Sequence, residues 1–358
     1  MNIVFRVDAS TLIGVGHIMR CLTLAEELRV RGSNIHFVCR NHSGNLNDLL
    51  RQRGMLLTVL PSQSIWKLVG DEYHTWLGAS QLEDAEQTIG TFKGCQPDWL
   101  IIDHYGIDVE WERRIYPHIG QLMVIDDLTN RHHVCDVLLD QNYSSNREQC
   151  YVNLVSNKCK LLVGPRYTLL RPEYAEYRKN QGSRNGEIQS VLVYFGGSDL
   201  QNMTGLTLTS LTQPELLSLE VDVVIGANNK HRLGLEKQAS ERPRTRIHGP
   251  KTHLAGIMAN ADLSVGAGGA TTWERMCLGL PSIVICVAEN QRSISEGLAR
   301  EGLIEFIGDA GEVTEKNIAS AIKLLAGDRS RMLAFTAKTQ LLVDGMGAVR
   351  IADILTKS

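Results

Sequence analysis

The sequence contains no tract of basic residues, no CxxC pair and no apolar run approaching the roughly 18 residues of a membrane span. Nucleic-acid binding needs clustered Lys and Arg to neutralise phosphates, and the formal net charge here is −3, so we expect no nucleic-acid partner. We also expect no membrane span. The first ten residues, MNIVFRVDAS, lack the basic and apolar regions of a signal peptide, which predicts a cytoplasmic protein.

Metal-binding motifs and the common hydrolase motifs are also missing. The eight cysteines show no zinc-ligand spacing, and there is no HExxH, GxSxG or Walker A motif. No third ligand follows Asp126-Asp127, so we expect capping or a salt bridge to Arg131 there, and we interpret His132-His133 as a surface pair. The sequence therefore predicts neither a metal ion nor another cofactor, and the cysteines are interpreted as buried, reduced thiols.

What the sequence does contain is a repeated alternation of short apolar runs and amphipathic helical patterns. The runs are rich in Val, Ile and Leu, which is typical of parallel strands buried on both faces. Between two such series lies a polar segment with several Gly, Ser and Asn residues, 172–189, which we interpret as an interdomain connector. The apolar runs span residues 3–7, 35–39, 56–60, 99–102, 122–125, 191–195, 221–225, 246–248, 263–265 and 282–286.

A chain of 358 residues is long enough for two domains. We predict an N-terminal Rossmann-like α/β domain over residues 1–175, and a C-terminal Rossmann-like domain with a helical tail over residues 188–358. Two such domains facing a cleft make up the glycosyltransferase-B architecture. A single continuous α/β sheet is the structural alternative.

A glycine-rich loop joins the first predicted strand to the first helix. Gly14 and Gly16 allow tight turning and close approach of a ligand, and the helix start beyond them favours an anion. His17 stands at this helix start, where the field favours the neutral imidazole, which can act as a base near neutral pH. Alternatively, the loop is only a tight turn and His17 contacts a backbone carbonyl.

A second glycine-rich loop, Gly266–Gly269, follows an apolar strand and opens a helix. Its bare amides, with the hydroxyl of Thr271, suit a diphosphate. Glu274 could accept two hydrogen bonds from a ribose diol, or it is simply a surface residue of the helix. A third turn contains Gly197 at the end of the first strand of the second series, and Asp199 beyond it serves a ligand or caps the next helix.

Other polar residues follow predicted strands directly. Asp8, Asp103–Tyr105 and Asp126-Asp127 come after strands of the first series, and Ala288–Gln291 comes after the 282–286 strand of the second. Because ligands bind at the carboxyl ends of parallel strands, we expect these groups to line one cleft.

Together these motifs resemble a known family. The segments that match in order are residues 6–10, 14–25, 103–105, 125–128, 139–142, 170–173, 195–199, 266–269, 273–275 and 288–291. They look like the UDP-2,4-diacetamido-2,4,6-trideoxy-β-L-altropyranose hydrolases of pseudaminic acid biosynthesis, a pathway that serves flagellin glycosylation and surface polysaccharides. That family is similar in turn to the two-domain transferase that moves GlcNAc from UDP-GlcNAc onto a lipid carrier.

The resemblance implies roles for individual residues. His17 becomes the base that activates water, and Tyr105 and Asn290 lie near the sugar. The loop Gly266–Gly269 takes the diphosphate, and Glu274 the ribose. The complete set comprises Gly14, Gly16, Asp8, Tyr105, Arg171, Asn290 and Gln291 for the substrate, and Gly197, Gly266, Gly268, Gly269, Thr271 and Glu274 for UDP.

The expected reaction is hydrolysis of a UDP-sugar with inversion at the anomeric carbon. UDP is a stable anion, so its departure needs charge stabilisation rather than a proton, and no acid/base carboxylate pair is required. Three alternatives stay open: a hydrolase of a related UDP-diacetamido sugar, a UDP-sugar-dependent glycosyltransferase, and a non-catalytic UDP-sugar-binding protein.

Overall fold

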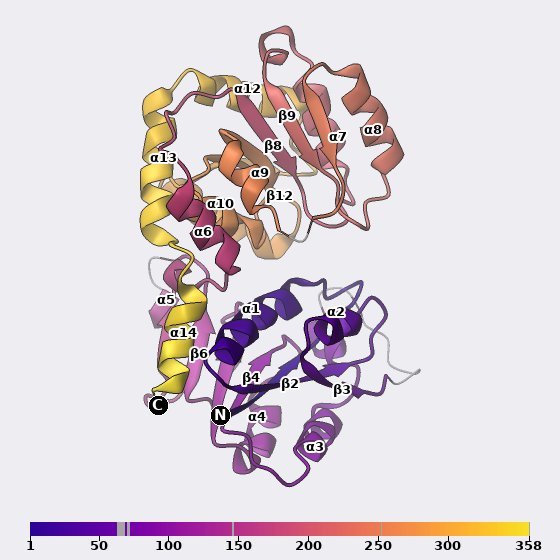
Figure 1. The fold of residues 1–358 in the computed structure, drawn as a ribbon, viewed down its shortest axis with the longest axis vertical. Helices are drawn as coiled ribbons and strands as arrows, with labels where there is room; N and C mark the ends of the chain where they lie inside the picture. Colours follow the sequence, from indigo (N-terminus) through magenta and orange to yellow (C-terminus); the bar gives the residue numbers. More distant parts are fainter. Residues whose placement is uncertain (63–68, 70–71, 145–146, 252, 358) are drawn as a thin grey trace. The chain divides into compact units, whose positions relative to one another are not determined.

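The computed structural model describes residues 1–62, 69, 72–144, 147–251 and 253–357. The chain forms two compact units, Met1–Leu170 with Met346–Ser358, and Arg171–Gly345. Each unit is built on its own sheet (Figure 1), which excludes the single continuous sheet and confirms the prediction of two α/β halves.

In the described residues, the sheet of the first unit has the strand order β3-β2-β1-β4-β5-β6-β7, and all neighbouring strands run parallel. Its strands are β1 (Asn2–Val7), β2 (Asn34–Arg40), β3 (Leu56–Leu60), β4 (Trp99–Asp103), β5 (Gln121–Ile125), β6 (Val137–Asp140) and β7 (Lys160–Val163). Its helices are α1 (Gly16–Val30), α2 (Asn47–Gln52), α3 (Gln81–Thr91), α4 (Val109–Ile115), α5 (Arg147–Tyr151) and α14 (Gly347–Thr356).

The described part of the second unit contains a parallel sheet of order β10-β9-β8-β11-β12-β13. Its strands are β8 (Ser190–Tyr194), β9 (Glu220–Val224), β10 (Thr245–His248), β11 (Leu263–Ala267), β12 (Ser282–Cys286) and β13 (Glu305–Asp309). Its helices are α6 (Pro172–Asn180), α7 (Met203–Ser210), α8 (Arg232–Glu241), α9 (Ala255–Asn260), α10 (Thr271–Cys277), α11 (Arg292–Arg300), α12 (Glu315–Ala326) and α13 (Arg329–Leu342).

Both sheets are doubly wound, and this explains the apolar composition of their strands. Side chains alternate between the two faces, so Phe5 and Val7 enter one core cluster with α1 and α14, while Val4 enters another with α3 and α4. In each unit the strand order reverses beside the first strand, between β1 and β4 and between β8 and β11. Ligands of such sheets bind at that reversal, and the loops that follow these four strands carry most of the predicted site residues.

The segment predicted as a connector is partly helical. Residues 172–180 form α6, with Pro172 in its first turn, where a missing N–H costs nothing. The helix is so polar that it resembles a linker in sequence, but Tyr174 is buried and anchors it.

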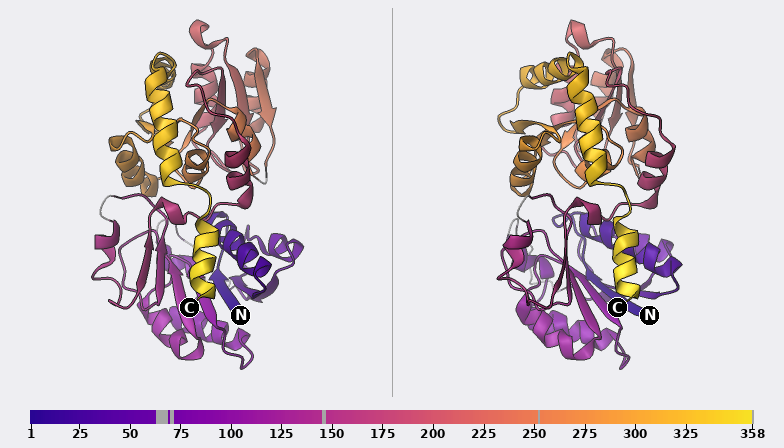
Figure 2. Two further views of the ribbon diagram at one scale, coloured as in Figure 1. Left: turned by 60° about the vertical axis from the view of Figure 1, so that its left-hand side comes forward. Right: turned by 90° about the vertical axis from the view of Figure 1, so that its left-hand side faces the viewer.

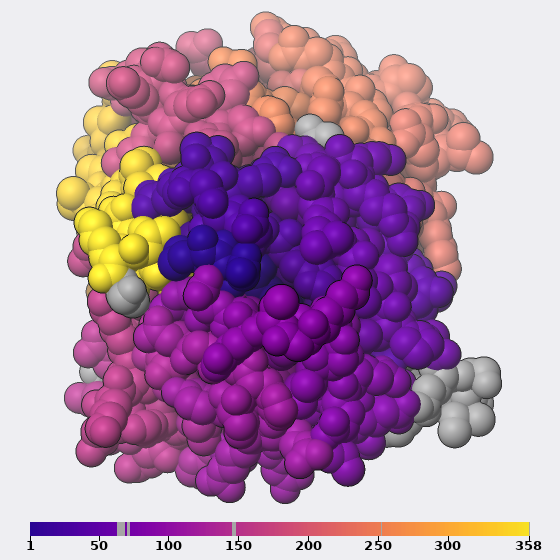
Figure 3. All heavy atoms as spheres, turned by 60° about the horizontal axis from the view of Figure 1, so that its bottom comes forward, coloured from indigo at the N-terminus to yellow at the C-terminus, as the bar shows by residue number. Residues whose placement is uncertain are grey.

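The last helix differs from the sequence-based division, which assigned the whole tail to the C-terminal domain. α14 lies against the first unit, as both views of Figure 2 show, and its yellow atoms adjoin the indigo N-terminal residues in Figure 3. Its apolar face enters the core cluster of β1 and α1, and Arg31 pairs with Asp353 at 2.5 Å. The residues of α14 in that cluster are Ala348, Ile351, Ala352 and Leu355. None of the helices in the described residues is long and apolar enough to cross a bilayer.

Replacing Ile351 by Ala should therefore destabilise the first unit. Ile351 is fully buried, and removing such a side chain costs about 2–5 kcal/mol through lost burial and the cavity left behind. Leu341→Ala in α13 is the matched control, because Leu341 is 87% exposed and its loss should change stability by at most about 0.5 kcal/mol. Urea unfolding followed by circular dichroism measures both, and equal losses would exclude α14 from the core.

Candidate active site

The first part of the candidate site lies where β1 and β4 end, at the strand-order reversal of the first unit. The loop after β1 turns back through a bridge between Ser10 and Gly14, and the Ser10 hydroxyl accepts hydrogen bonds from the amides of Leu12 and Ile13. Gly14 has a φ of 79°, a left-handed conformation that favours glycine. The turn delivers the chain to Gly16, the first residue of α1, and so fixes where His17 stands.

His17 is held by Asp103, the last residue of β4. The distance from His17 Nδ1 to Asp103 Oδ1 is 2.5 Å. Burial opposes ionisation of Asp103, but the charges of Arg20 and His17 keep its pKa well below the usual value. An ionised carboxylate only accepts hydrogen bonds, so Nδ1 carries the proton, and in the neutral ring the lone pair lies on Nε2. His17 is thus oriented as a base, with a carboxylate fixing its tautomer.

Arg20 completes this arrangement one helical turn after His17. Its guanidinium donates to both oxygens of Asp103, at 2.5 and 2.6 Å, and to Asp127 at 2.6 Å. Residues i and i+3 share a helix face, which is why Arg20 reaches the same carboxylate as His17. The positive charge of Arg20 balances Asp103, so the carboxylate orients the imidazole without being an isolated buried charge.

Tyr105 is tied to the same group of charges. Its hydroxyl donates to Asp127 at 2.8 Å, and Asp127 also accepts from Asn142 at 3.0 Å. Burial, and next the negative charge of Asp127, raise the pKa of Tyr105 well above its ordinary value, so the phenol stays protonated. The ring stands edge-on to that of His17, with centroids 4.6 Å apart.

Two further aromatic side chains, Tyr73 and Trp76, pack against the ring of Tyr105. Trp76 stacks on the Tyr105 ring at 5.7 Å, and Tyr73 meets both rings edge-on. Trp76 is buried, so the pair packs behind Tyr105 and holds its ring in place. This role of Tyr73 and Trp76 was not identified from the sequence.

Asp8 does not fit the predicted substrate contact. Its side chain is fully buried, its carboxylate lies 2.7 Å from Arg6 and 3.2 Å from His104, and it accepts the amide hydrogen of Arg40 at 2.6 Å. Arg6 and Arg40 both bind the equally buried Asp84. Asp8 therefore belongs to an internal charge network behind the site. Through His104, next to Asp103 and Tyr105, it supports the loop that carries them.

In the second unit, the predicted loop Gly266–Gly269 is only partly a loop: Gly266 and Ala267 are the last residues of β11, and Gly268 and Gly269 follow it, beside the strand-order reversal. A Cβ on Gly266 would lie 2.6 Å from Arg275 Nη1, and one on Gly268 would lie 2.5 Å from the hydroxyl of Ser295. Arg275 is buried and donates to the carbonyl of Ala267 at 2.8 Å. These close approaches require glycine at both positions, and they give the backbone here a fixed shape.

Glu274 stands in α10 behind this loop and is half-buried. Burial raises its pKa to about 7, although Tyr174, Arg275 and Arg171 favour the ionised form. Tyr174 accepts the amide hydrogen of Leu254 at 3.2 Å, so its own proton is free to point to Glu274. Glu274 is therefore a held side chain and not the surface residue of the alternative interpretation.

The remaining predicted residues of the second unit have different surroundings. Gln291 packs against the loop, with its Nε2 3.6 Å from where a Cβ of Gly269 would be, while Asn290 is exposed. Thr271 is the first residue of α10. Arg171 pairs with Glu173 at 2.8 Å. Gly197 accepts the amide hydrogen of Asn228 at 3.0 Å.

Asp199 takes the alternative role that the sequence left open. Its carboxylate accepts the amide hydrogens of Met203 and Thr204 at 2.9 and 3.0 Å, so it caps the start of α7.

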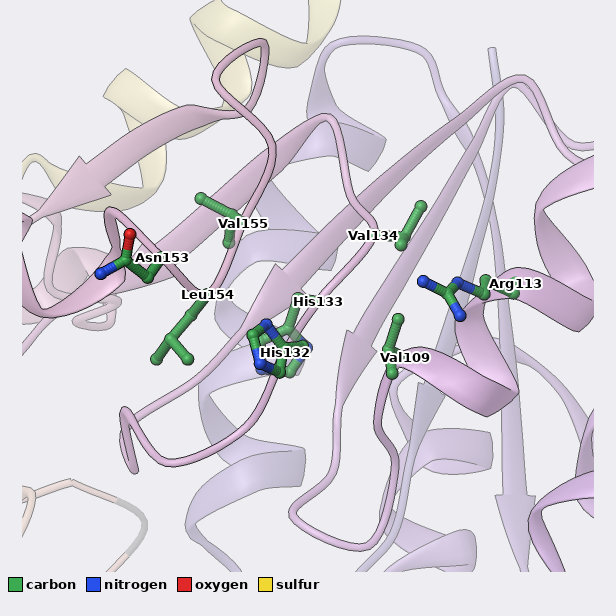
Figure 4. A pocket seen from close by; sticks show the side chains of 8 residues that line it. All are labelled: Val109, Arg113, His132, His133, Val134, Asn153, Leu154 and Val155. Atoms are coloured by element: carbon green, nitrogen blue, oxygen red, sulfur yellow. The ribbon is translucent and has the colours of Figure 1, made fainter.

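The histidine pair lies elsewhere, in a surface hollow of about 340 Å³ (Figure 4). His132 is exposed, as expected, but His133 is fully buried and its Nδ1 lies 2.6 Å from Glu112. Asp126 pairs with Arg131 at 2.9 Å, as the sequence predicts. Within the described residues no group of three His, Cys, Asp or Glu side chains is arranged to hold a metal ion.

Comparison with known proteins agrees with this fold and sequence pattern, although no family model matches. The chain is 28% identical over 304 residues to a Campylobacter jejuni protein named UDP-2,4-diacetamido-2,4,6-trideoxy-β-L-altropyranose hydrolase, with 84% of this chain and 97% of that protein covered. It is 22% identical to the spore coat polysaccharide biosynthesis protein SpsG of Bacillus subtilis, over 99% of this chain and 98% of the relative.

Among solved structures, MurG of Acinetobacter baumannii superposes with a TM-score of 0.69 at 13% identity, covering 100% of this chain and 99% of that one. At such low identity the likeness concerns the fold alone. The protein thus has the glycosyltransferase-B fold, and its sequence resembles that of the UDP-diacetamido-sugar hydrolase over most of its length.

Proposed function

We propose that this protein hydrolyses a UDP-sugar to the free sugar and UDP, and that the substrate is UDP-2,4-diacetamido-2,4,6-trideoxy-β-L-altropyranose of pseudaminic acid biosynthesis. The observation that carries the proposal is the His17–Asp103 pair, an oriented base at the strand-order reversal of a parallel sheet. The similarity to the Campylobacter hydrolase supports the substrate class.

In the proposed reaction, Nε2 of His17 removes a proton from a water molecule while the water oxygen attacks the anomeric carbon. The C–O bond to the diphosphate breaks, and its electron pair leaves with UDP. Attack opposite the leaving group inverts the anomeric configuration. Asp103 orients the imidazole and balances its charge as it becomes positive, while Arg20 holds Asp103 in place.

The nucleotide belongs, in this proposal, to the second unit. Backbone amides of Gly266–Gly269, with Thr271, bind the diphosphate, and Glu274 accepts hydrogen bonds from the ribose. Gly197 lines the same end of the sheet.

The sugar contacts are assigned to Tyr105, Arg171, Asn290 and Gln291, with Gly14 and Gly16 leaving room beside His17. Apart from adjacent backbone, no described heavy atom lies within 4 Å of a Cβ built on Gly14 or Gly16, so there is open space beside this loop. We do not assign a substrate contact to Asp8, because its carboxylate is buried among Arg6, Arg40 and His104.

The direct test follows the reaction by NMR with a panel of UDP-diacetamido sugars. The proposal expects UDP and a free sugar whose first-formed anomer is inverted, and it expects the altro-configured sugar to react fastest. Transfer to an added acceptor in place of water would identify a glycosyltransferase. Tight UDP-sugar binding without turnover would identify a binding protein.

The ionisation of Glu274 predicts how nucleotide binding depends on pH. The ionised carboxylate of Glu274 is the form that accepts hydrogen bonds from both ribose hydroxyls. Binding of the nucleotide therefore favours the ionised form and lowers the pKa of Glu274 from its raised value of about 7. Affinity for UDP-GlcNAc, whose diphosphate does not titrate in this range, should then rise about tenfold from about pH 6 to about pH 8. Isothermal titration calorimetry measures this, and Glu274→Gln should bind more weakly with no such pH dependence. If the affinity of Glu274→Gln for UDP-GlcNAc rises with pH as steeply as that of the wild type, the assignment of Glu274 to the ribose site is wrong.

A further inference from the structure

Two cysteines on the first sheet lie in contact, at the end opposite the candidate active site. Cys135 precedes β6 and Cys159 directly precedes β7, and their sulfur atoms are 3.6 Å apart. Asp136 and Lys160, the residues that follow the two cysteines, are joined by a backbone hydrogen bond of 2.8 Å from the amide of Lys160 to the carbonyl of Asp136. The parallel register of β6 and β7 therefore fixes the pair in place.

The two thiols differ in a way that suits stepwise chemistry. Cys135 is buried, whereas Cys159 is partly exposed. The hydrogen bond that the two sulfur atoms share lowers the pKa of Cys159 and raises that of Cys135. The accessible sulfur is thus the one that more readily becomes the nucleophilic thiolate.

We propose that Cys135 and Cys159 are a reversible disulfide site that exchanges with low-molecular-weight disulfides of the oxidised glutathione class. The Cys159 thiolate attacks one sulfur of the small disulfide, forming a mixed disulfide and releasing one thiolate. The Cys135 thiol loses its proton and attacks Cys159 sulfur, which releases the second small thiol and closes the protein disulfide. The protein loses two electrons and two protons, and the small disulfide gains them.

The geometry requires only a small movement. A disulfide bond is about 2 Å long, so the sulfur atoms need to approach by roughly 1.5 Å, within reach of a side-chain rotation. The bond would join the starts of two adjacent parallel strands and close the segment between them into a ring. Since His17 and Asp103 lie at the other end of the sheet, we expect oxidation to raise the thermal unfolding temperature and leave nucleotide-sugar turnover unchanged.

The test treats the purified full chain with oxidised glutathione, blocks remaining thiols with N-ethylmaleimide, and maps the peptides by mass spectrometry without reduction. The expected result is a cross-linked pair of peptides containing Cys135 and Cys159, lost again after dithiothreitol. Cys135→Ser should accumulate glutathione on Cys159, while Cys159→Ser should leave Cys135 unmodified.

Two exposed cysteines provide the control. Cys95 and Cys150 are solvent-accessible, and the double variant Cys95→Ser/Cys150→Ser should still form the cross-link. The proposal is overturned if the wild-type protein carries glutathione only on Cys95 or Cys150, or if thiols 135 and 159 are both recovered alkylated. The readout is independent of catalytic activity, so it stands apart from the proposed function.

Discussion

Replacing His17 by Asn should lower turnover about 10²–10⁴-fold while UDP affinity stays within a few fold. A positioned general base contributes a factor of this size, and the amide of Asn cannot accept the proton of water at neutral pH. The nucleotide contacts are assigned to the second unit, so binding should survive. Steady-state rates of UDP release and calorimetric titration with UDP measure the two effects separately.

A second histidine serves as the control for this experiment. His132 is exposed and lines the surface hollow of Figure 4, whose lining residues include none of those assigned to the reaction, so His132→Asn should keep the wild-type rate. If His17→Asn retains wild-type turnover, the base has been assigned to the wrong residue.

Asp103→Asn should be nearly as damaging, with a fall in turnover of about 10²–10⁴-fold. The amide nitrogen of Asn can donate to His17 Nδ1, which would hold the imidazole with its proton on Nε2, where no proton can be taken from water. The expected split is a low kcat with little change in KM, because the ring stays in place in the wrong tautomer.

The variant Asp127→Asn tests whether Asp103→Asn lowers turnover by misorienting His17 or only by removing a negative charge near Arg20. Asp127 also binds Arg20, at 2.6 Å, and accepts hydrogen bonds from Tyr105 and Asn142, whereas the carboxylate at Nδ1 of His17 is that of Asp103. Its substitution should therefore cost clearly less turnover than Asp103→Asn. Thermal melts of both variants show whether the loss of a partner for Arg20 unfolds the protein. Equal kinetic losses in two folded variants would argue against a tautomer effect.

The alternating pattern of the sequence was sufficient to predict most of the fold. Strands β1–β5 and β8–β12 and most of the longer helices follow from continuous apolar runs and helical periodicity. The strands β6 and β7 have only four residues each, VLLD and KLLV, and β13 contains a glycine, so none of them forms a run long enough to be recognised. The position of α14 depends on contacts such as that of Arg31 with Asp353, across 322 positions of the chain, which local sequence does not encode.

The candidate site, like the fold, could be predicted only where it depends on local sequence. Glycine loops and strand ends are local features, so Gly14, His17, Asp103 and Tyr105 could be identified from the sequence. The role of Asp103 could not, because it arises from a contact across 86 positions of the chain. Arg20 resembles any helix arginine until its carboxylate partners are known. Asp8 was misassigned as a substrate contact because the charges that surround it come from β1, β2 and the loop after β4.

The position of α14 also bears on how the protein matures. The core of the first unit includes Ile351 and Leu355, which are synthesised only after the whole of the second unit. During synthesis, the part of the N-terminal core that α14 covers therefore stays exposed as an apolar strip while the intervening unit of 175 residues, Arg171–Gly345, is made. A nascent chain stalled before residue 346 would keep that strip open to chaperones until α14 has been synthesised and packs onto it.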